Sequence, residues 1–211
     1  PRCVVWPSRA VPGWDGVDAP TVAFPRTPLV KALTTHHPTD AHAVGYLVTG
    51  EKKQPRLNLP SLGALGDGAV LTHTVWLDVD RPDHTPWPDD KTRRRAFMDA
   101  SVLAPEAAVY TTRAGLRLVW VLATPIPVLT YRSFLTSFMD RLEDEGLEGI
   151  DRASAEWNRC FRLPYVMRDG EATDPLIDVR PLERGLTLTW TPPTPPRASD
   201  TPLPHPRPSF T

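Results

Sequence analysis

Two aspartates in an apolar segment are the residues of this sequence that most clearly could do chemistry. Residues 75–80 read Val-Trp-Leu-Asp-Val-Asp. Because side chains alternate between the two faces of a β-strand, Asp78 and Asp80 are expected on one face, roughly 7 Å apart along the strand. Like charges at this spacing repel, and oxygen-ligated Mg²⁺ or Mn²⁺ would relieve the repulsion. The segment therefore predicts a metal site, and an ordinary edge strand with one polar face is the alternative.

A second segment carries two arginines on either side of a glycine. Residues 110–120 read Tyr-Thr-Thr-Arg-Ala-Gly-Leu-Arg-Leu-Val-Trp, and we expect one long strand over residues 109–122. In that strand Arg113, Gly115 and Arg117 would share a face. Two forked guanidiniums beside a residue without a side chain would let a polyanion such as a triphosphate approach closely. The alternative is a solvated strand face.

A third segment begins with an acid that follows an apolar residue. Asp151 comes directly after Ile150 and could add a third carboxylate, while Asp178 is a second candidate for that place. Further along stand Arg159, Arg162 and Arg168, which add positive charge. A surface loop with scattered arginines is the alternative interpretation.

These three segments, in this order, resemble the motifs of the archaeo-eukaryotic primase superfamily, and within it the primase-polymerases of plasmids, phages and eukaryotes. The resemblance spans roughly residues 40–185. Leu77–Asp80 is similar to the first motif and Ile150-Asp151 to the third, and residues 158–163 follow a pattern of the N-R-x-F-R-L kind. In the second motif, Gly115 and Arg117 stand where the family has S-x-H, whose His contacts the phosphates of the incoming nucleotide.

The resemblance implies an α+β primase fold, with a core sheet related to RNA-recognition domains and an N-terminal αβ unit. It also implies a DNA primase and polymerase of a plasmid, phage or other mobile element, which transfers nucleotides by two-metal chemistry. Mg²⁺ or Mn²⁺ would be held by Asp78, Asp80 and Asp151. A dNTP or NTP would be bound by Arg113, Gly115, Arg117, Arg159, Arg162 and Arg168. The implied partners are a single-stranded DNA template and a C-terminal helicase or other replication domain.

Two other functions stay open at this point. The first is a catalytically inactive primase-like module that binds nucleic acid during replication, which the arginine at position 117 favours. The second is a glycosyltransferase whose D-x-D strand binds a nucleotide-sugar. A primer-extension assay would separate the first from a polymerase, and nucleotide-sugar hydrolysis would reveal the second.

Composition sets outer limits on these hypotheses. The chain has 211 residues, a formal net charge of −1 and 40% hydrophobic residues, so one large domain with a core is expected and any nucleic-acid contact must be local. The two cysteines form no metal or disulfide pattern, which suggests a reducing, cytoplasmic environment. No apolar run reaches the about 18 residues of a membrane span, so no membrane partner is expected.

The prolines divide the chain. Residues 191–211 are proline-rich and predict a linker or tail, so we expect the catalytic domain over residues 1–190, with something beyond the linker. Residues 1–28 are also punctuated by proline and predict irregular surface chain, and residues 51–68 predict a loop. Strands are expected at 43–48, 70–80, 161–163, 177–180 and 186–190, and helices at 89–100 and from a Thr130 cap to Glu145. This mixture predicts an α+β layer fold.

Overall fold

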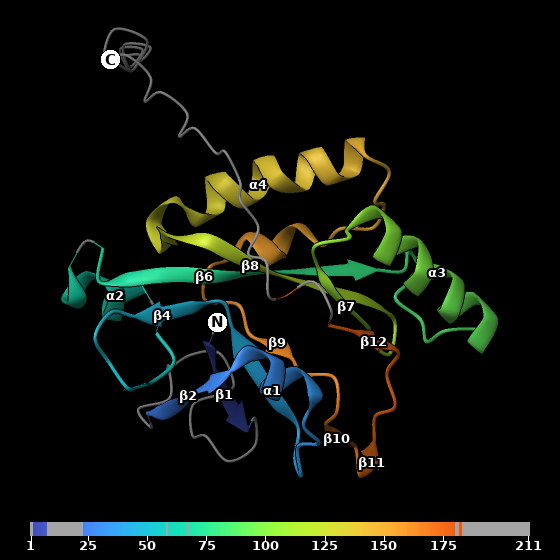
Figure 1. Cartoon of the computed structure of the whole chain (residues 1–211), viewed down its shortest axis with the longest axis horizontal. Coiled ribbons are helices and arrows are strands. Elements are labelled where there is room, and N and C mark those ends of the chain that lie inside the picture. The colour runs from blue at the N-terminus through green and yellow to red at the C-terminus, as the bar shows by residue number, and fades with distance from the viewer. Residues whose placement is uncertain (1, 8–22, 58, 67, 180–181, 183–211) are drawn as a thin grey trace, which may run out of the picture.

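A central antiparallel sheet organises the molecule (Figure 1). The computed structural model describes residues 2–7, 23–57, 59–66, 68–179 and 182. The five strands of this sheet lie in the order β12-β7-β8-β6-β4. Their bounds are Ile177–Asp178 (β12), Ala108–Thr111 (β7), Gly115–Pro127 (β8), Val70–Asp80 (β6) and Tyr46–Val48 (β4). The mixed helix and strand architecture agrees with the α+β class expected from the sequence.

A second five-stranded sheet has the order β5-β2-β1-β3-β9 and joins N-terminal strands to β9, which comes late in the sequence. Its strands are Lys53–Gln54 (β5), Phe24–Pro28 (β2), Arg2–Pro7 (β1), Ala41–Val44 (β3) and Phe161–Arg162 (β9). The expectation of irregular chain over residues 1–28 is therefore wrong for the described part. Cys3, Val4 and Trp6 are fully buried, so β1 contributes to the core despite the prolines around it.

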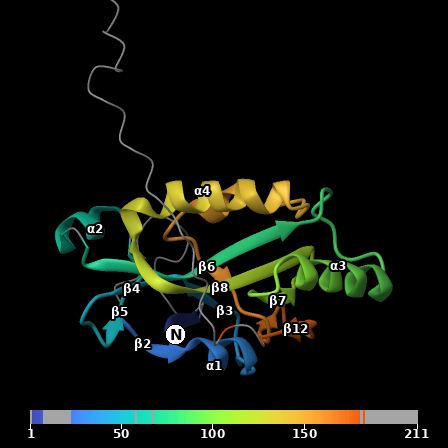
Figure 2. The same ribbon diagram turned by 45° about the horizontal axis from the view of Figure 1, so that its top comes forward.

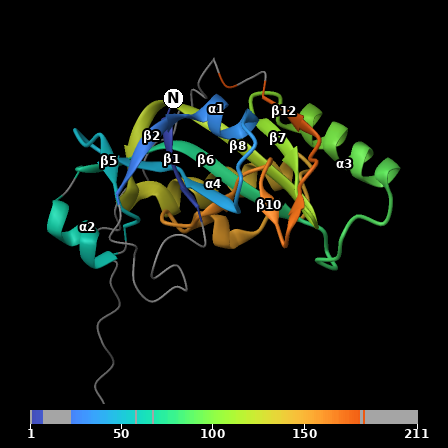
Figure 3. The same ribbon diagram turned by 90° about the horizontal axis from the view of Figure 1, so that it is seen from below.

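The two faces of the central sheet are covered differently (Figures 1 and 2). Helix α4 (Val128–Asp144) packs on one face, where its apolar side chains meet those of β6 and β8. The other face packs on the second sheet and on α1 (Leu29–Thr34), which Figure 3 shows from below. Trp76 of β6 stacks on Phe161 of β9 at a ring-centroid distance of 5.6 Å across this interface. Side chains on that face of β6 therefore lie between two layers.

Helix α3 (Asp90–Leu103) follows β6 and lies beside β7. As predicted, Asp89 caps it, because its side chain accepts a hydrogen bond of 2.7 Å from the backbone N–H of Thr92. The predicted Thr130 cap of α4 is wrong. Thr130 lies inside the helix and its hydroxyl donates to the carbonyl of Pro127, the residue that precedes the first turn. Gly146, at φ +101°, follows the helix end near the expected place.

Three other expected elements differ from the structure. Residues 43–48 divide at Gly45 between β3 (Ala41–Val44) and β4 (Tyr46–Val48), and a Cβ at Gly45 would lie 2.3 Å from the carbonyl oxygen of Thr74. Residues 51–68 contain β5 and α2 (Leu59–Leu65) as well as loop. The long strand expected at 109–122 is the β7–β8 hairpin, in which the N–H of Thr112 donates to the carbonyl of Gly115. The expected strand at 186–190 and the proline-rich segment lie outside the described residues.

Smaller elements complete the part that bears on function. A short 3₁₀ helix, Arg152–Ala155, follows the end of the α4 region. Strands β10 (Met167–Arg168) and β11 (Glu171–Ala172) form a separate hairpin. Within the described residues, no helix has both the length and the apolar character needed to cross a membrane.

Candidate functional site

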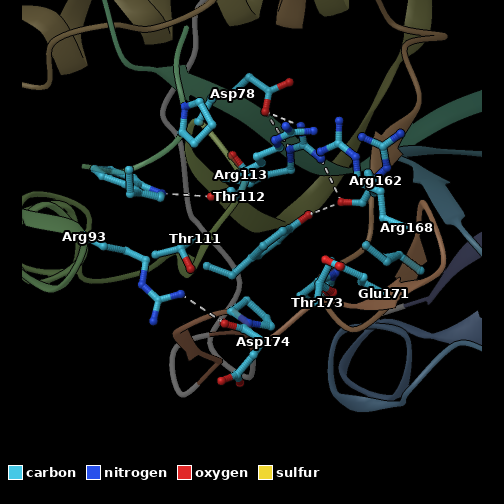
Figure 4. A pocket seen from close by; sticks show the side chains of 18 of the residues that line it. Asp78, Arg93, Thr111, Thr112, Arg113, Arg162, Arg168, Glu171, Thr173 and Asp174 are labelled. Carbon is cyan, nitrogen blue, oxygen red and sulfur yellow. Dashed lines mark hydrogen bonds and ion pairs between the residues drawn. The ribbon is translucent and has the colours of Figure 1, made fainter. Parts of the chain in front are cut away.

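A cleft of about 1180 Å³ lies where the C-terminal end of β6 meets the β7–β8 turn, β9 and the β10–β11 hairpin (Figure 4). Asp78 lies at one end of the cleft and Asp174 at the other, with Arg113, Arg162 and Arg168 between them. The walls therefore carry both acidic and basic side chains.

The strand carboxylates enter the cleft from β6. Asp78 and Asp80 both line it, and Asp78 is only 7% exposed because its face of β6 packs toward the second sheet. Asp80 is two residues nearer the strand end and more exposed. The alternation expected from the sequence thus places both acids on the inner face, beyond the buried Trp76.

Asp151 is brought to the same place by backbone pairing. The N–H of Asp80 donates to the carbonyl of Gly149, and the N–H of Asp151 donates to the carbonyl of Asp78, each at 2.8 Å. Gly149 permits this approach, because its φ is +82° and a Cβ there would lie 2.4 Å from the carbonyl oxygen of Asp80. Asp178 instead pairs with Val109 at the far edge of the sheet. Of the two candidates for the third carboxylate, Asp151 is therefore the one that lies beside Asp78 and Asp80.

Arg117 lies directly opposite Asp78 in the β6–β8 register, and its side chain is fixed by hydrogen bonds. Its Nε and Nη2 donate to Oδ1 of Asp78, the former at 2.7 Å, and its Nη1 donates to the carbonyl of Arg162 at 2.7 Å. The guanidinium also lies 5.3 Å from the centre of the Phe161 ring, and Arg117 is 8% exposed. These contacts engage every guanidinium nitrogen of Arg117 within the protein, so it is not free to clamp a triphosphate here.

Arg159 connects two of the carboxylates. Its Nη2 lies 2.6 Å from Oδ2 of Asp151 and 3.4 Å from Oδ2 of Asp78. Burial raises the pKa of Asp80, and the charges of Asp78 and Asp151 raise it further. His84 lies 3.5 Å from Asp80. The contribution of Asp78 and Asp151 to this shift shows that Asp80 is repelled by the neighbouring carboxylates.

The carboxylate oxygens are the ligand type that Mg²⁺ and Mn²⁺ prefer. As they stand, no three His, Cys, Asp or Glu side chains of the described residues are placed to hold a metal ion together. The Arg159 guanidinium lies between Asp78 and Asp151. The residues therefore fit a divalent ion in their chemistry, while in this arrangement a guanidinium takes the place of the cation.

Arg113 stands apart from the other arginines because its side chain has no hydrogen-bonding or ionic partner among the described residues. The sequence predicted Arg113 on a strand face, but it lies in the β7–β8 turn. The turn is fixed by three hydrogen bonds: from Trp87 Nε1 to the carbonyl of Thr112 (2.9 Å), from the Arg81 N–H to that of Ala114 (3.0 Å), and from the Thr112 N–H to that of Gly115 (2.8 Å). Arg113 is thus an exposed cation on a turn whose backbone is fixed by hydrogen bonds.

The other two predicted arginines of the cleft, Arg162 and Arg168, differ in how they are paired. Burial, together with the charges of Arg162 and Arg113, lowers the pKa of Arg168, whose nearest acid is Asp169 at 3.7 Å. Arg162 is paired with Asp40 through hydrogen bonds of 2.7 and 3.0 Å. Two guanidiniums that repel each other at the wall of a cleft would be relieved by an anion.

Gly115 has a packing role in the structure. It lies opposite Asp80, and a Cβ on it would meet the carbonyl oxygen of Val79 at 2.2 Å. Its small size therefore lets β8 approach β6 closely.

Sequence reasoning missed four supporting residues. Asp40 holds Arg162, and Tyr110 donates a hydrogen bond of 2.7 Å to the carbonyl of Arg162. The hydroxyl of Ser154 accepts from the N–H of Asp78 at 3.0 Å, and Trp87 supports the Arg113 turn. Tyr110 lies in β7, Ser154 lies in the 3₁₀ helix, and Asp40 and Trp87 lie outside the strands, so no single local pattern in the sequence marks these residues.

Comparison with known proteins adds little to this picture. No known family model matches the chain, and no curated protein matches it. A solved structure with some likeness is the polymerase domain of ligase D from Mycobacterium tuberculosis in complex with DNA, at 15% identity and a TM-score of 0.39. The likeness covers 65% of this chain and 51% of that one, so the chain spans about half its length. A TM-score of this size does not assign a family, and we base the function on the residues of the cleft.

Proposed function

We propose that this domain is a metal-dependent nucleotidyltransferase of the primase-polymerase kind, acting on a nucleoside triphosphate and a single-stranded DNA template. The observation that carries the proposal is the pairing of residues 149–151 with the end of β6. It sets Asp151 beside Asp78, which lies at one end of a cleft whose wall carries Arg113, an arginine without a partner in the part of the chain that the structure describes. The three segments singled out from the sequence all contribute residues to this region.

In this proposal Asp78, Asp80 and Asp151 hold Mg²⁺ or Mn²⁺. When bound, the metal would activate the attacking hydroxyl and neutralise charge on the pyrophosphate leaving group. The protein's own contribution is to keep three carboxylates within one small region. Strand alternation does this for two of them, and the Gly149 approach does it for the third.

Arg113 and Arg168 would bind the triphosphate. The turn that carries Arg113 is fixed by hydrogen bonds, and among the described residues Arg113 has no partner and Arg168 has one ionic contact, to Asp169 at 3.7 Å. A guanidinium fork suits phosphate oxygens, and such donors stabilise charge that grows in the transition state. Arg117 and Arg162, which are held by Asp78 and Asp40, would instead position the carboxylates and the cleft wall.

The test is a nucleotide-incorporation assay on a primed and an unprimed single-stranded DNA template, with Mg²⁺ or Mn²⁺ and labelled nucleotides. We expect metal-dependent extension, and loss of at least about a hundredfold in Asp80→Asn, because an oxyanion ligand of the metal is removed. Asp99→Asn is the matched control, since Asp99 lies exposed on α3 and faces only Arg95, at 3.8 Å. Full activity in Asp80→Asn would refute the assignment.

One observation favours a second candidate, a non-catalytic module that binds nucleotides or DNA. Asp78 is engaged by both Arg117 and Arg159, which leaves it little capacity for a metal. That module would bind a nucleoside triphosphate in the cleft but add none to a primer. Binding that depends on Arg113, with no extension under any metal, would favour this candidate over the first.

A further inference from the structure

We infer that Arg159 is an internal counter-cation that must leave the carboxylates before a divalent metal binds between them, so that this residue sets the metal affinity of the site. The inference rests on the proposed function, because it concerns the same three carboxylates. It adds a residue to the metal-binding step that no part of the sequence comparison assigns to it.

The position of Arg159 carries the inference. One nitrogen, Nη2, contacts Oδ2 of both Asp78 and Asp151. A cation that contacts both carboxylates from one point stands at the oxygens that would hold a divalent ion. A guanidinium and a divalent ion cannot share that place, because both are positive.

The two arginines at Asp78 are held very differently. Arg117 uses Nε, Nη1 and Nη2 in hydrogen bonds and is 8% exposed. Arg159 uses Nη2 alone for its ionic contacts among the described residues, and its side chain is 30% exposed. The Arg159 guanidinium also lies 5.9 Å from the centre of the Phe161 ring. Arg159 can therefore swing out toward solvent while Arg117 stays, which leaves Asp78 oriented and frees its Oδ2.

Charge points the same way. With Arg117 and Arg159 both in place, two cations face three carboxylates, and Asp80 lies next to the other two with no arginine paired to it within the described ranges. Removal of Arg159 leaves a stronger negative charge, which attracts a divalent ion more strongly. Metal binding and the Arg159 contact are thus alternatives for the same carboxylate oxygens.

The experiment is a Mn²⁺ titration of the metal-free domain, followed by the electron paramagnetic resonance signal of free Mn²⁺, without nucleotide or DNA. We compare wild type with Arg159→Gln, which keeps a polar side chain and removes the charge. The control is Arg152→Gln. Arg152 lies on the same segment, but it pairs with Asp140 at 2.5 Å and with Glu143, on the exposed side of α4.

We expect Arg159→Gln to bind Mn²⁺ at least about tenfold more tightly than wild type, and Arg152→Gln to match wild type. In EDTA, Arg159→Gln should melt at a lower temperature than wild type, and Mn²⁺ should raise its melting temperature by more than it raises that of wild type. The second readout detects the exchange even if the absolute affinities are low.

Three outcomes would overturn the inference. Equal Mn²⁺ affinity in wild type and Arg159→Gln would show that the arginine does not compete, while the metal site of the proposed function would stand. Weaker binding in Arg159→Gln would show that Arg159 supports the metal. If none of the three proteins binds Mn²⁺, the metal-dependent function fails, and the inference fails with it.

Discussion

The sharpest prediction concerns Arg117, because the structure gives it a role in stability where the sequence suggested phosphate binding. Arg117→Ala leaves Asp78 buried at 7% exposure without its main cation. Removal of one partner from a buried ion pair costs about 3–5 kcal/mol of unfolding free energy. The carbonyl of Arg162 adds little, because Tyr110 still donates to it at 2.7 Å.

For a domain of this size, about 3–5 kcal/mol corresponds to a fall in melting temperature of roughly 6–20 °C. The pair is buried, so the fall should change little between low and high salt, unlike the loss of a surface ion pair. Arg117→Lys should lie between wild type and Arg117→Ala, because an ammonium can reach Asp78 but cannot also keep the fork geometry. Thermal melting in two salt concentrations measures each of these effects.

A double variant separates ion pairing from packing. Replacement of both partners, Asp78→Leu with Arg117→Met, removes the two charges together and should recover most of the stability lost in Arg117→Met alone. The reasoning is refuted if Arg117→Ala melts within about 2 °C of wild type, or if the costs of the two single substitutions simply add in the double variant.

Two further predictions test the carboxylate end of the cleft. The pKa of Asp80 is raised above 3.8 in the folded protein, so the charged carboxylate lowers the stability above the folded pKa, and this loss disappears as the pH falls to the unfolded pKa. Asp80→Asn should therefore melt at a higher temperature than wild type at pH 7, and the difference should shrink toward pH 4. A difference in melting temperature that stays constant with pH would contradict this. Gly149→Ala should destabilise the protein more than Gly146→Ala, because both glycines have positive φ but only a Cβ at Gly149 would clash with the Asp80 carbonyl. Equal urea-unfolding free energies for the two variants would count against the close backbone contact that brings Asp151 to the end of β6.

The part of the site that the sequence could predict depended on local rules. The period of two along β6 was enough to place Asp78 and Asp80 on one face. The α3 cap at Asp89 follows from a short side chain next to a free N–H. Such features involve residues close in the chain, so one sequence contains what is needed to find them.

The part that could not be predicted depends on register and on turns. Nothing in residues 109–122 marks the turn at Arg113 strongly, since its one glycine, Gly115, lies at the start of β8. Once the hairpin is known, the register sets Arg117 opposite Asp78, and the ion pair follows. The proline count similarly suggested irregular chain near the N-terminus, although β1 is an interior strand whose pairing partners lie far along the sequence.

The joining of distant segments in the second sheet bears on how the chain folds as it is made. Strand β3 pairs with β1 on one side and with β9 on the other, so the sheet stays incomplete until residues 161–162 have left the ribosome. At about 5–20 residues per second, the roughly 150 residues after β1 take on the order of 8–30 s to synthesise. During that time one edge of β3 lacks its partner, and the many long-range pairings favour slow folding. Asp151 and Arg159 emerge between β8 and β9, so the carboxylate cluster assembles only after β6 and β8 have been made.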